Sequence, residues 1–371
     1  MFPKITFSPD KFGYYQAGDL KTYSKIEALE WAKRTNSGCT WIFNDSVYGQ
    51  IDWSKEPDLS LWELYKLRCH QIRDSYDYVV LWYSGGSDSQ NMLDAWIESG
   101  AKIDEVASVW SNDGSKSERS AFDAEVKFVV FPKIKNLDIK FRLIDQSQMI
   151  LDYINKSKKN HWEYEINQNL SPNNGVRGLL REQVEDWSRL IASGVRMCFV
   201  WGSDKPMMSN DGNIYFSDVV DNCVSPYVQR NYYNGWYDEL FYWTPDFPDL
   251  VVKQAHVVKR FINRPAAPDS FFQKQPHKYG YSPHKKMWLS DWGIKQLLYP
   301  TWNPRTFCAG KSPNTVLSRI DSWLLNSNIH EVDIFRGFIS STFAQLQQLV
   351  PEQSHLPAFH QKFFHTRHYR I

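Results

Sequence analysis

The central part of the chain alternates between short apolar runs and longer segments whose apolar residues recur every three or four positions. Apolar runs of this length predict buried strands, and the periodic segments predict amphipathic helices. We expect strands at 78–83, 105–110, 139–144 and 196–201, and helices at 89–99, 119–130 and, around a turn at 171–175, over 147–190. Alternation of strands and helices is typical of a parallel sheet, so the pattern predicts an α/β fold with a doubly wound parallel sheet.

The residues before this alternation have a mixed pattern. Periodic segments at 24–32 and 60–74 predict two helices, and the apolar run at 40–43 predicts a strand between them. The second helix leads directly into the strand at 78–83. We therefore expect residues 1–72 to form an N-terminal α+β extension packed on the core.

The residues after the alternation are rich in turns and aromatic side chains. Asn210-Asp211-Gly212-Asn213 is a hairpin signal, and the segment 249–261 predicts a helix. The segment 285–350 favours helices throughout. The sequence thus predicts three parts: the extension at 1–72, an α/β domain at 73–250 and a mainly helical C-terminal region at 251–371.

Bulk composition narrows the class of protein. The 371 residues carry a formal net charge of +1, which gives no support for a nucleic-acid partner. No apolar run is long enough to span a membrane, and the first residues lack a signal-peptide core. The five cysteines include no Cys-x-x-Cys pair, which argues against a zinc ribbon or an iron–sulfur cluster. We expect a cytoplasmic protein with no membrane partner.

The most informative segment follows the first predicted strand. Residues 84–89 read Ser-Gly-Gly-Ser-Asp-Ser, and a predicted helix comes next. Gly85 and Gly86 allow a sharp turn and close approach of the backbone to a ligand. A helix that begins after them directs N–H groups and its positive dipole end at the loop, which suits a phosphate. The loop has neither the lysine of a Walker loop nor the third glycine of a dinucleotide loop.

The same six residues carry a family resemblance. Ser84, Gly85, Gly86, Ser87, Asp88 and Ser89 match every position of the loop motif of the PP-loop ATP pyrophosphatase superfamily, which includes asparagine synthetases, NAD synthetases and phosphoadenylylsulfate reductase relatives. The chain is also similar, around Trp-Ser-Lys-Glu-Pro at 53–57, to uncharacterised PP-loop proteins of tailed bacteriophages. The resemblance implies an adenine nucleotide alpha-hydrolase-like fold of HUP type. It also implies that the loop holds the β and γ phosphates of ATP.

Asp88 has two interpretations. A carboxylate that works with phosphate oxygens and waters is how proteins usually hold Mg²⁺, and the resemblance favours this role. The alternative is that its side chain caps the following helix.

A second loop, at 202–206, reads Gly-Ser-Asp-Lys-Pro and also follows a predicted strand. Carboxyl ends of parallel strands meet at one sheet edge, so both loops are expected to face the same ligand. Lys205 could neutralise charge on the departing pyrophosphate, and Asp204 could share the metal. A plain surface turn is the alternative.

Other candidates follow from the resemblance and from position. The end of the second strand, with Ser108 and Trp110, is where the superfamily receives adenosine, although Trp110 could equally belong to the core. Arg177 and Arg181 are candidates for contact with the α phosphate or the second substrate, or else lie on a solvated helix face.

The cysteines and histidines suggest weaker alternatives. Cys308 could act as the catalytic thiol of a sulfonucleotide reductase-like enzyme, although a lone cysteine is more often inert. Four histidines, at 355, 360, 365 and 368, lie near the C-terminus, and His365 and His368 would share a helix face. A solvated tail or partner contact is favoured over metal binding. His256 is expected to be structural, on a helix.

The sequence therefore predicts an adenylating enzyme that uses ATP and Mg²⁺. A carboxylate, amide or carbonyl oxygen of an unidentified acceptor would attack the α phosphorus, and an amine or similar nucleophile would then displace AMP. The alternatives are the reductase-like transferase and a nucleotide-binding regulatory module without turnover. A homodimer is compatible with the sequence, which does not name the acceptor.

Overall fold

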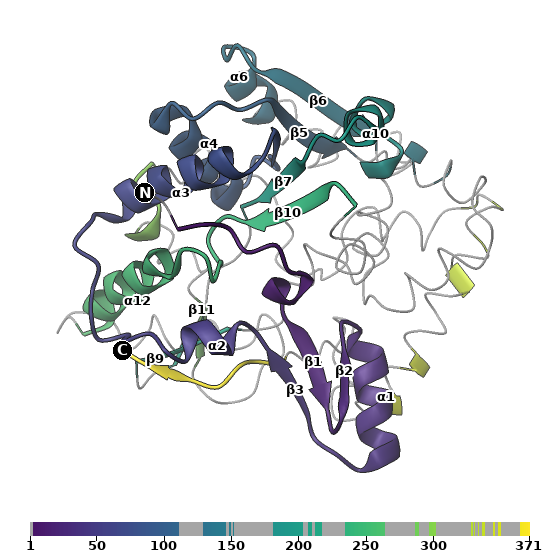
Figure 1. The fold of residues 1–371 in the computed structure, drawn as a ribbon, viewed down its shortest axis with the longest axis vertical. Coiled ribbons are helices and arrows are strands. Elements are labelled where there is room, and N and C mark those ends of the chain that lie inside the picture. The colour runs from purple at the N-terminus through teal and green to yellow at the C-terminus, as the bar shows by residue number, and fades with distance from the viewer. Residues whose placement is uncertain are drawn as a thin grey trace.

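In the computed structural model, the described residues are 3–110, 129–145, 148–149, 151, 181–202, 207–209, 212–216, 234–263, 286–288, 297–301, single positions between 328 and 349, and 364–371. Their centre is a five-stranded parallel sheet, with two smaller sheets beside it (Figure 1). Residues 119–128 of the predicted helix 119–130, and most of the segment 147–180, lie outside the described residues.

The central sheet has the strand order β10-β7-β4-β5-β6, and every neighbouring pair is parallel. Its strands are β4 (Tyr78–Trp82), β5 (Glu105–Trp110), β6 (Lys140–Asp145), β7 (Met197–Trp201) and β10 (Trp236–Leu240). From β4 the chain proceeds outward through β5 and β6, then returns to add β7 on the other side. The point where the order reverses, between β4 and β7, is where open sheets of this kind bind ligands.

Both faces of the sheet are packed. Val79 and Leu81 of β4 lie in one buried cluster with side chains of α3 (Leu61–Ser75) and α4 (Ser87–Ser99). Val80, between them, lies in a second cluster with Trp187 of α10 (Glu185–Ala192). Because successive side chains of a strand point to opposite faces, helices cover both sides, as Figure 1 shows. The fold is therefore α/β with a doubly wound parallel sheet, as the sequence predicts.

The helices begin and end where local chemistry directs them. Ser60 and Glu63 form a capping box at the start of α3, in which each side chain accepts the other residue's backbone N–H. Helix α4 ends at Gly100, whose φ of 71° is a left-handed conformation that favours glycine. The strands at 78–82, 105–110, 140–145 and 197–201 and these two helices confirm the corresponding predictions to within a few residues.

The N-terminal residues form a small antiparallel sheet in the order β2-β1-β3, seen in purple in Figure 1. Helix α1 packs on this sheet, and its N-cap Ser24 accepts the N–H of Glu27. The elements are η1 (Pro9–Phe12), β1 (Tyr14–Ala17), β2 (Leu20–Thr22), α1 (Lys25–Thr35), β3 (Cys39–Ile42) and α2 (Asp45–Tyr48). The helix and the third strand match the sequence pattern.

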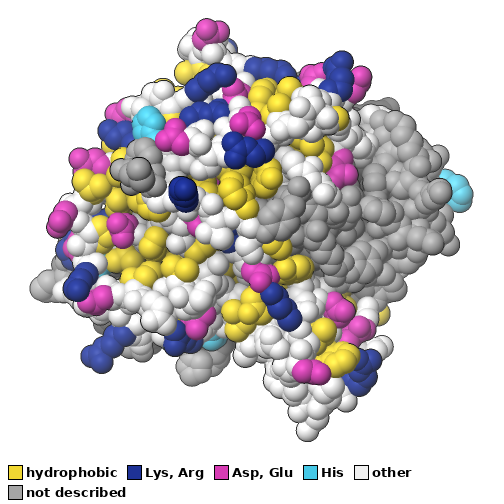
Figure 2. All heavy atoms as spheres, in the orientation of Figure 1, with side chains coloured by type: hydrophobic (Ala, Val, Ile, Leu, Met, Phe, Trp, Pro, Cys, Tyr) yellow, Lys and Arg dark blue, Asp and Glu magenta, His cyan; other side chains and the backbone are white. Residues whose placement is uncertain are grey.

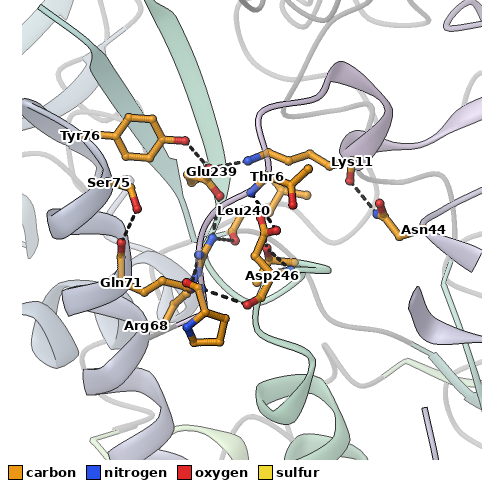
Figure 3. A network of polar contacts seen from close by, with 12 residues as sticks. Thr6, Lys11, Asn44, Arg68, Gln71, Ser75, Tyr76, Glu239, Leu240 and Asp246 are labelled. Atoms are coloured by element: carbon orange, nitrogen blue, oxygen red, sulfur yellow. Dashed lines mark hydrogen bonds and ion pairs between the residues drawn. The ribbon is translucent and has the colours of Figure 1, made fainter. Parts of the chain in front are cut away.

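A buried ionic network joins the N-terminal residues to the edge strand β10 (Figure 3). The carboxylate of Glu239 accepts hydrogen bonds from Lys11, Arg68 and Tyr76, and all four side chains are buried. Arg68 also donates to the side chain of Gln71 at 2.7 Å. One apolar cluster includes Tyr76 and Leu240, which take part in the network, and extends in sequence from Ile5 to Tyr369.

A third sheet, in the order β11-β8-β9-β12, combines distant parts of the chain. Strands β8 (Met207–Ser209) and β9 (Asn213–Tyr215) pair antiparallel, which agrees with the predicted hairpin. Their neighbours are β11 (Lys286–Trp288) and β12 (Tyr369–Arg370), so residues 286–288 form a strand where the sequence favours a helix.

Two further helices, α12 and α6, belong to the fold. Helix α12 (Pro248–Ile262) confirms the prediction at 249–261, and His256 on it bonds the carbonyl of Trp53 at 2.9 Å, which is a structural role. The short helix α6 (Phe131–Ile134) lies near α4, where Lys133 donates to Asp94.

The predicted helix face for His365 and His368 is wrong. Both residues lie in a non-helical segment before β12. The His368 ring stacks on Tyr215 of β9 at a centroid distance of 4.6 Å, and the His365 ring lies 5.2 Å from Tyr215 at a tilted angle. Pairing of β12 with β9 and the bond from the Thr366 N–H to the Phe216 carbonyl hold the segment beside β9, so both imidazoles lie next to an aromatic ring.

The surface in Figure 2 mixes Lys and Arg with Asp and Glu side chains, as a net charge of +1 suggests. Within the described residues, no helix is long and apolar enough to cross a membrane.

Candidate functional site

The Ser-Gly-Gly-Ser-Asp-Ser loop connects β4 to α4 at the carboxyl edge of the sheet, beside the point where the strand order reverses. Gly85 has a φ of 76°, and a Cβ built there would lie 3.2 Å from Val130 Cγ2 and 3.4 Å from Val129 Cγ1. The left-handed backbone favours glycine, and the Val130 side chain leaves little room for a Cβ. Gly86 is the N-cap of α4 and supplies no side-chain cap. The first N–H groups of this 13-residue helix therefore point toward the loop.

Hydrogen bonds of Ser84 and Ser89 fix the shape of the loop. The Ser89 hydroxyl accepts the N–H of Ser84 at 3.2 Å, donates to the carbonyl of Gly86 at 3.1 Å and lies 3.1 Å from the Ser84 hydroxyl. The Ser84 hydroxyl also accepts the N–H of Gly86 at 3.3 Å. Hydrogen bonds within the loop thus set its backbone conformation. A preorganised backbone of this kind suits an anion-binding site.

Ser108 supports the start of the loop from β5. Its side chain is 3% exposed, and its hydroxyl donates to the carbonyl of Tyr83, whose N–H in turn donates to Ala107. The predicted contact of Ser108 with adenosine stays a prediction. The Trp110 side chain lies outside the described residues.

Asp88 is held at two points by tyrosines from distant segments. The hydroxyl of Tyr299 donates to the Asp88 carboxylate, and the hydroxyl of Tyr242 donates to the Asp88 backbone carbonyl at 2.8 Å. Gly86, rather than Asp88, is the N-cap, so the helix-capping alternative is wrong. Neither tyrosine is suggested by a local motif, which is why sequence reasoning missed both.

The donor set around the loop fits a phosphate-bound Mg²⁺. Among the described residues, no group of three or more His, Cys, Asp or Glu side chains could hold a metal by itself. Mg²⁺ in nucleotide sites, however, is typically held by one or two carboxylates together with phosphate oxygens and waters. Asp88 at the loop is compatible with that arrangement, whereas a metal held by protein ligands alone is not.

The second predicted loop begins in contact with the first. Gly202 follows β7 directly, and a Cβ built on it would lie 3.0 Å from both the Asp88 carbonyl oxygen and Ser89 Cα. The ends of β4 and β7 are therefore adjacent, as two loops that share one ligand would need to be. Asp204 and Lys205 lie outside the described residues, so their roles stay predictions; the same holds for Arg177 and Cys308.

Replacement of Gly202 by alanine should therefore disturb the loop. The contacted atoms are backbone, which cannot move aside like a flexible side chain, so we expect a loss of about 1–3 kcal/mol in the free energy of unfolding. Gly38→Ala is the matched control, because no atom lies within 4 Å of the added Cβ. Urea unfolding of both variants is the measurement, and equal midpoints would contradict the contact.

Arg181 is buried, so its solvated-face alternative is wrong. The guanidinium donates to Asp238 Oδ2 at 2.7 Å and lies over the rings of Phe199 and Trp236, with the side chain 4% exposed. Asp238 also accepts the indole N–H of Trp201 at 2.7 Å. The predicted contact of Arg181 with the α phosphate stays a prediction. The contacts shown are those of an ion pair on the α10 face of the sheet.

Comparisons with known proteins identify no family for this chain, and the similarity to a solved structure is weak. No family model matches the sequence, and no curated protein matches it. Among solved structures, the chain is similar to the NH3-dependent NAD synthetase from Campylobacter jejuni subsp. jejuni NCTC 11168 in complex with the nitrate ion, at 17% identity and a TM-score of 0.27. The match covers 39% of this chain and 58% of that one. The class of fold therefore rests on the strand order and the two packed faces.

Proposed function

We propose that this protein binds ATP with Mg²⁺ at the loop 84–89 and cleaves it between the α and β phosphates to adenylate an acceptor. The observation that carries the proposal is the loop itself. A Ser-Gly-Gly-Ser-Asp-Ser sequence, with Gly85 in a left-handed conformation, leads into the N-terminus of α4 where the strand order reverses. Helix N-termini at such edges are suited to phosphate groups.

Different residues of the chain would have different roles in that reaction. N–H groups at the start of α4 and the hydroxyl of Ser87 would hold the pyrophosphate that leaves. Asp88 would hold the Mg²⁺, which supplies charge neutralisation when bound. Lys205 and Asp204, on the loop that starts beside Asp88, are the proposed further contacts.

The proposed bond changes are those of an in-line displacement. An acceptor oxygen forms a bond to the α phosphorus while the bond from that phosphorus to the bridging oxygen breaks. The electron pair leaves with pyrophosphate, and the product is an acyl or imidoyl adenylate. An amine then attacks the activated carbon, AMP leaves with the electron pair of its C–O bond, and the proton that the nitrogen loses passes to solvent.

Two of the three cysteines that the structure describes are unsuited to act as sulfur nucleophiles. Cys69 and Cys198 are fully buried, and burial raises the pKa of each thiol well above its ordinary value. A thiol that stays protonated is a poor nucleophile. Together with the lack of a Cys-x-x-Cys pair in the sequence, this supports C–N bond formation as the proposed class.

The proposal is tested with the full chain in two steps. Calorimetry with α,β-methylene-ATP and Mg²⁺ measures binding without turnover. Incubation with ATP and pools of carboxylates and amines then measures released products. We expect binding, and AMP and pyrophosphate in equal amounts. ADP and orthophosphate would overturn the cleavage position, absence of binding would overturn the site, and binding without any product would favour the regulatory module.

Gly85→Ala should weaken this binding specifically. A non-glycine residue in the left-handed region costs about 1–2 kcal/mol, and if the loop shifts to relieve it, affinity falls by about tenfold. Gly194→Ala is the matched control, because Gly194 also has a positive φ of 90° but precedes β7, at the opposite edge of the sheet. Both variants should lose stability, and only Gly85→Ala should lose affinity in the same calorimetric titration. Equal affinities for the two variants would argue against the loop as the binding site.

A further inference from the structure

A short segment far along the chain, residues 298–301, is hydrogen-bonded to α3 and α4. The carbonyl of Leu298 accepts the hydroxyl of Tyr65 at 3.0 Å. Tyr299, which lies 211 residues after Asp88 in sequence, donates to the Asp88 carboxylate. Thr301 donates to Asp94 Oδ2 at 2.9 Å. Residues 298–301 therefore lie along α4, with Tyr299 at the loop.

Packing holds the side chain of Tyr299 in place beside Asp88. Tyr299 is 1% exposed, its ring lies 5.7 Å from that of Tyr242, and Tyr242 in turn lies 5.5 Å from the ring of Tyr65. Rings packed on one another cannot rotate away without opening the cluster. The Tyr299 hydroxyl is thus held at the position where it meets the carboxylate.

The two tyrosine hydroxyls bond different parts of Asp88. A phenol hydroxyl donates and a carboxylate only accepts, so the Tyr299 hydroxyl fixes one carboxylate oxygen of Asp88. The Tyr242 hydroxyl bonds the backbone carbonyl of the same residue at 2.8 Å.

A purely structural role explains less of this arrangement. An aspartate in the first turn of a helix already interacts favourably with the helix dipole and, unless it is fully buried, with water. Asp88 is only partly buried, so it does not need a tyrosine to compensate for burial. The buried Tyr299 hydroxyl restricts the orientation of the Asp88 carboxylate beyond what packing requires.

We propose that Tyr299 is a positioning residue, which holds the Asp88 carboxylate in the orientation that binds the divalent cation of the ATP site. The inference rests on the proposed function and assigns to residues 298–301 a part in it. Outer partners of metal ligands typically change metal affinity by about 10–100-fold when removed. Because Phe at 299 keeps the ring and removes one oxygen, we expect the lower end of that range.

The experiment uses Mn²⁺ and α,β-methylene-ATP, titrated into the full chain with and without the metal. For Tyr299→Phe we expect binding in the presence of Mn²⁺ to weaken by about tenfold, and metal-free binding to stay unchanged. Tyr242→Phe is the matched control, since it also removes a buried hydroxyl, which bonds the Asp88 backbone carbonyl and the Asn91 side chain rather than the Asp88 carboxylate. Its ratio of metal-bound to metal-free affinity should match the wild type.

The outcomes separate this inference from the proposed function. Wild-type protein that binds no nucleotide would overturn the proposed function, and the role of Tyr299 with it. Wild-type binding with an unchanged metal dependence in Tyr299→Phe would overturn the role of Tyr299 alone. An equal loss with and without Mn²⁺ would show a structural role and also overturn it. In an Asp88→Asn background, Tyr299→Phe should have no further effect on the metal dependence.

Discussion

Replacement of Glu239 by glutamine should destabilise the protein by about 3–5 kcal/mol, because it leaves buried cations without their partner. The carboxylate is fully buried and pairs with Lys11 and with Arg68 Nη2, the latter at 2.7 Å. Glutamine keeps the volume but removes the charge that offsets both. Denaturant unfolding, followed by tryptophan fluorescence, measures the loss.

Low pH should reduce the difference in stability between the wild type and Glu239→Gln. Burial would raise the pKa of Glu239, but the charges of Lys11 and Arg68 outweigh it and hold the pKa below its ordinary value. A depressed folded-state pKa contributes stability above the unfolded-state value of about 4.3, and that stability is lost as pH falls through the folded-state pKa. The stabilities of wild type and Glu239→Gln should therefore differ fully above about pH 4.3 and converge as the pH falls from there through the folded-state pKa of Glu239.

Glu185→Gln is the matched control for the same chemical change. Its pair with Arg189 spans 4.0 Å, and both side chains are exposed, at 83% and 68%. Exposed pairs contribute about 0–1 kcal/mol, so this variant should unfold close to the wild type. If Glu239→Gln behaved like Glu185→Gln, the network in Figure 3 would not be what holds the N-terminal residues to β10.

The same residues explain why β10 could not be predicted from the sequence. Trp236–Leu240 includes Asp238 and Glu239, and two adjacent carboxylates argue against a buried strand. The alternation of the strand sends them to opposite faces, where Arg181 compensates Asp238 and Arg68 compensates Glu239. These partners lie 57 and 171 residues away, so no local pattern reports them.

The strands and helices around the loop are predictable for the opposite reason. The central strands and α4 are specified by apolar runs, helical spacing and the glycines at 85, 86 and 100, which all act within a few residues. The loop and the adjacency of Gly202 follow from parallel pairing of β4 and β7. Tyr299 and Tyr242 do not follow, because their contacts with Asp88 depend on how distant segments pack.

Asp88→Asn should reduce pyrophosphate release by about 10²–10³-fold, the range typical for loss of one group that stabilises charge in a transition state. Asparagine has the same shape, and its amide oxygen can still accept from the Tyr299 hydroxyl, so the loop should keep its conformation. What it lacks is the negative charge that would hold Mg²⁺. Nucleotide affinity without metal should therefore stay near the wild-type value, while affinity in Mg²⁺ falls.

Asp249→Asn is the control for the stability effect of Asp88→Asn, because both substitutions neutralise an aspartate in the first turn of a helix. Asp249 also lies in the first turn of a helix, α12, so its neutralisation removes only the interaction with the helix dipole, about 0.3–1 kcal/mol. Asp88→Asn should show a stability loss of the same size, together with a loss of turnover that Asp249→Asn does not share. Unchanged turnover in Asp88→Asn would place the metal on another carboxylate. Because Tyr299 acts only through Asp88, that result would also reduce the tyrosine to a structural contact.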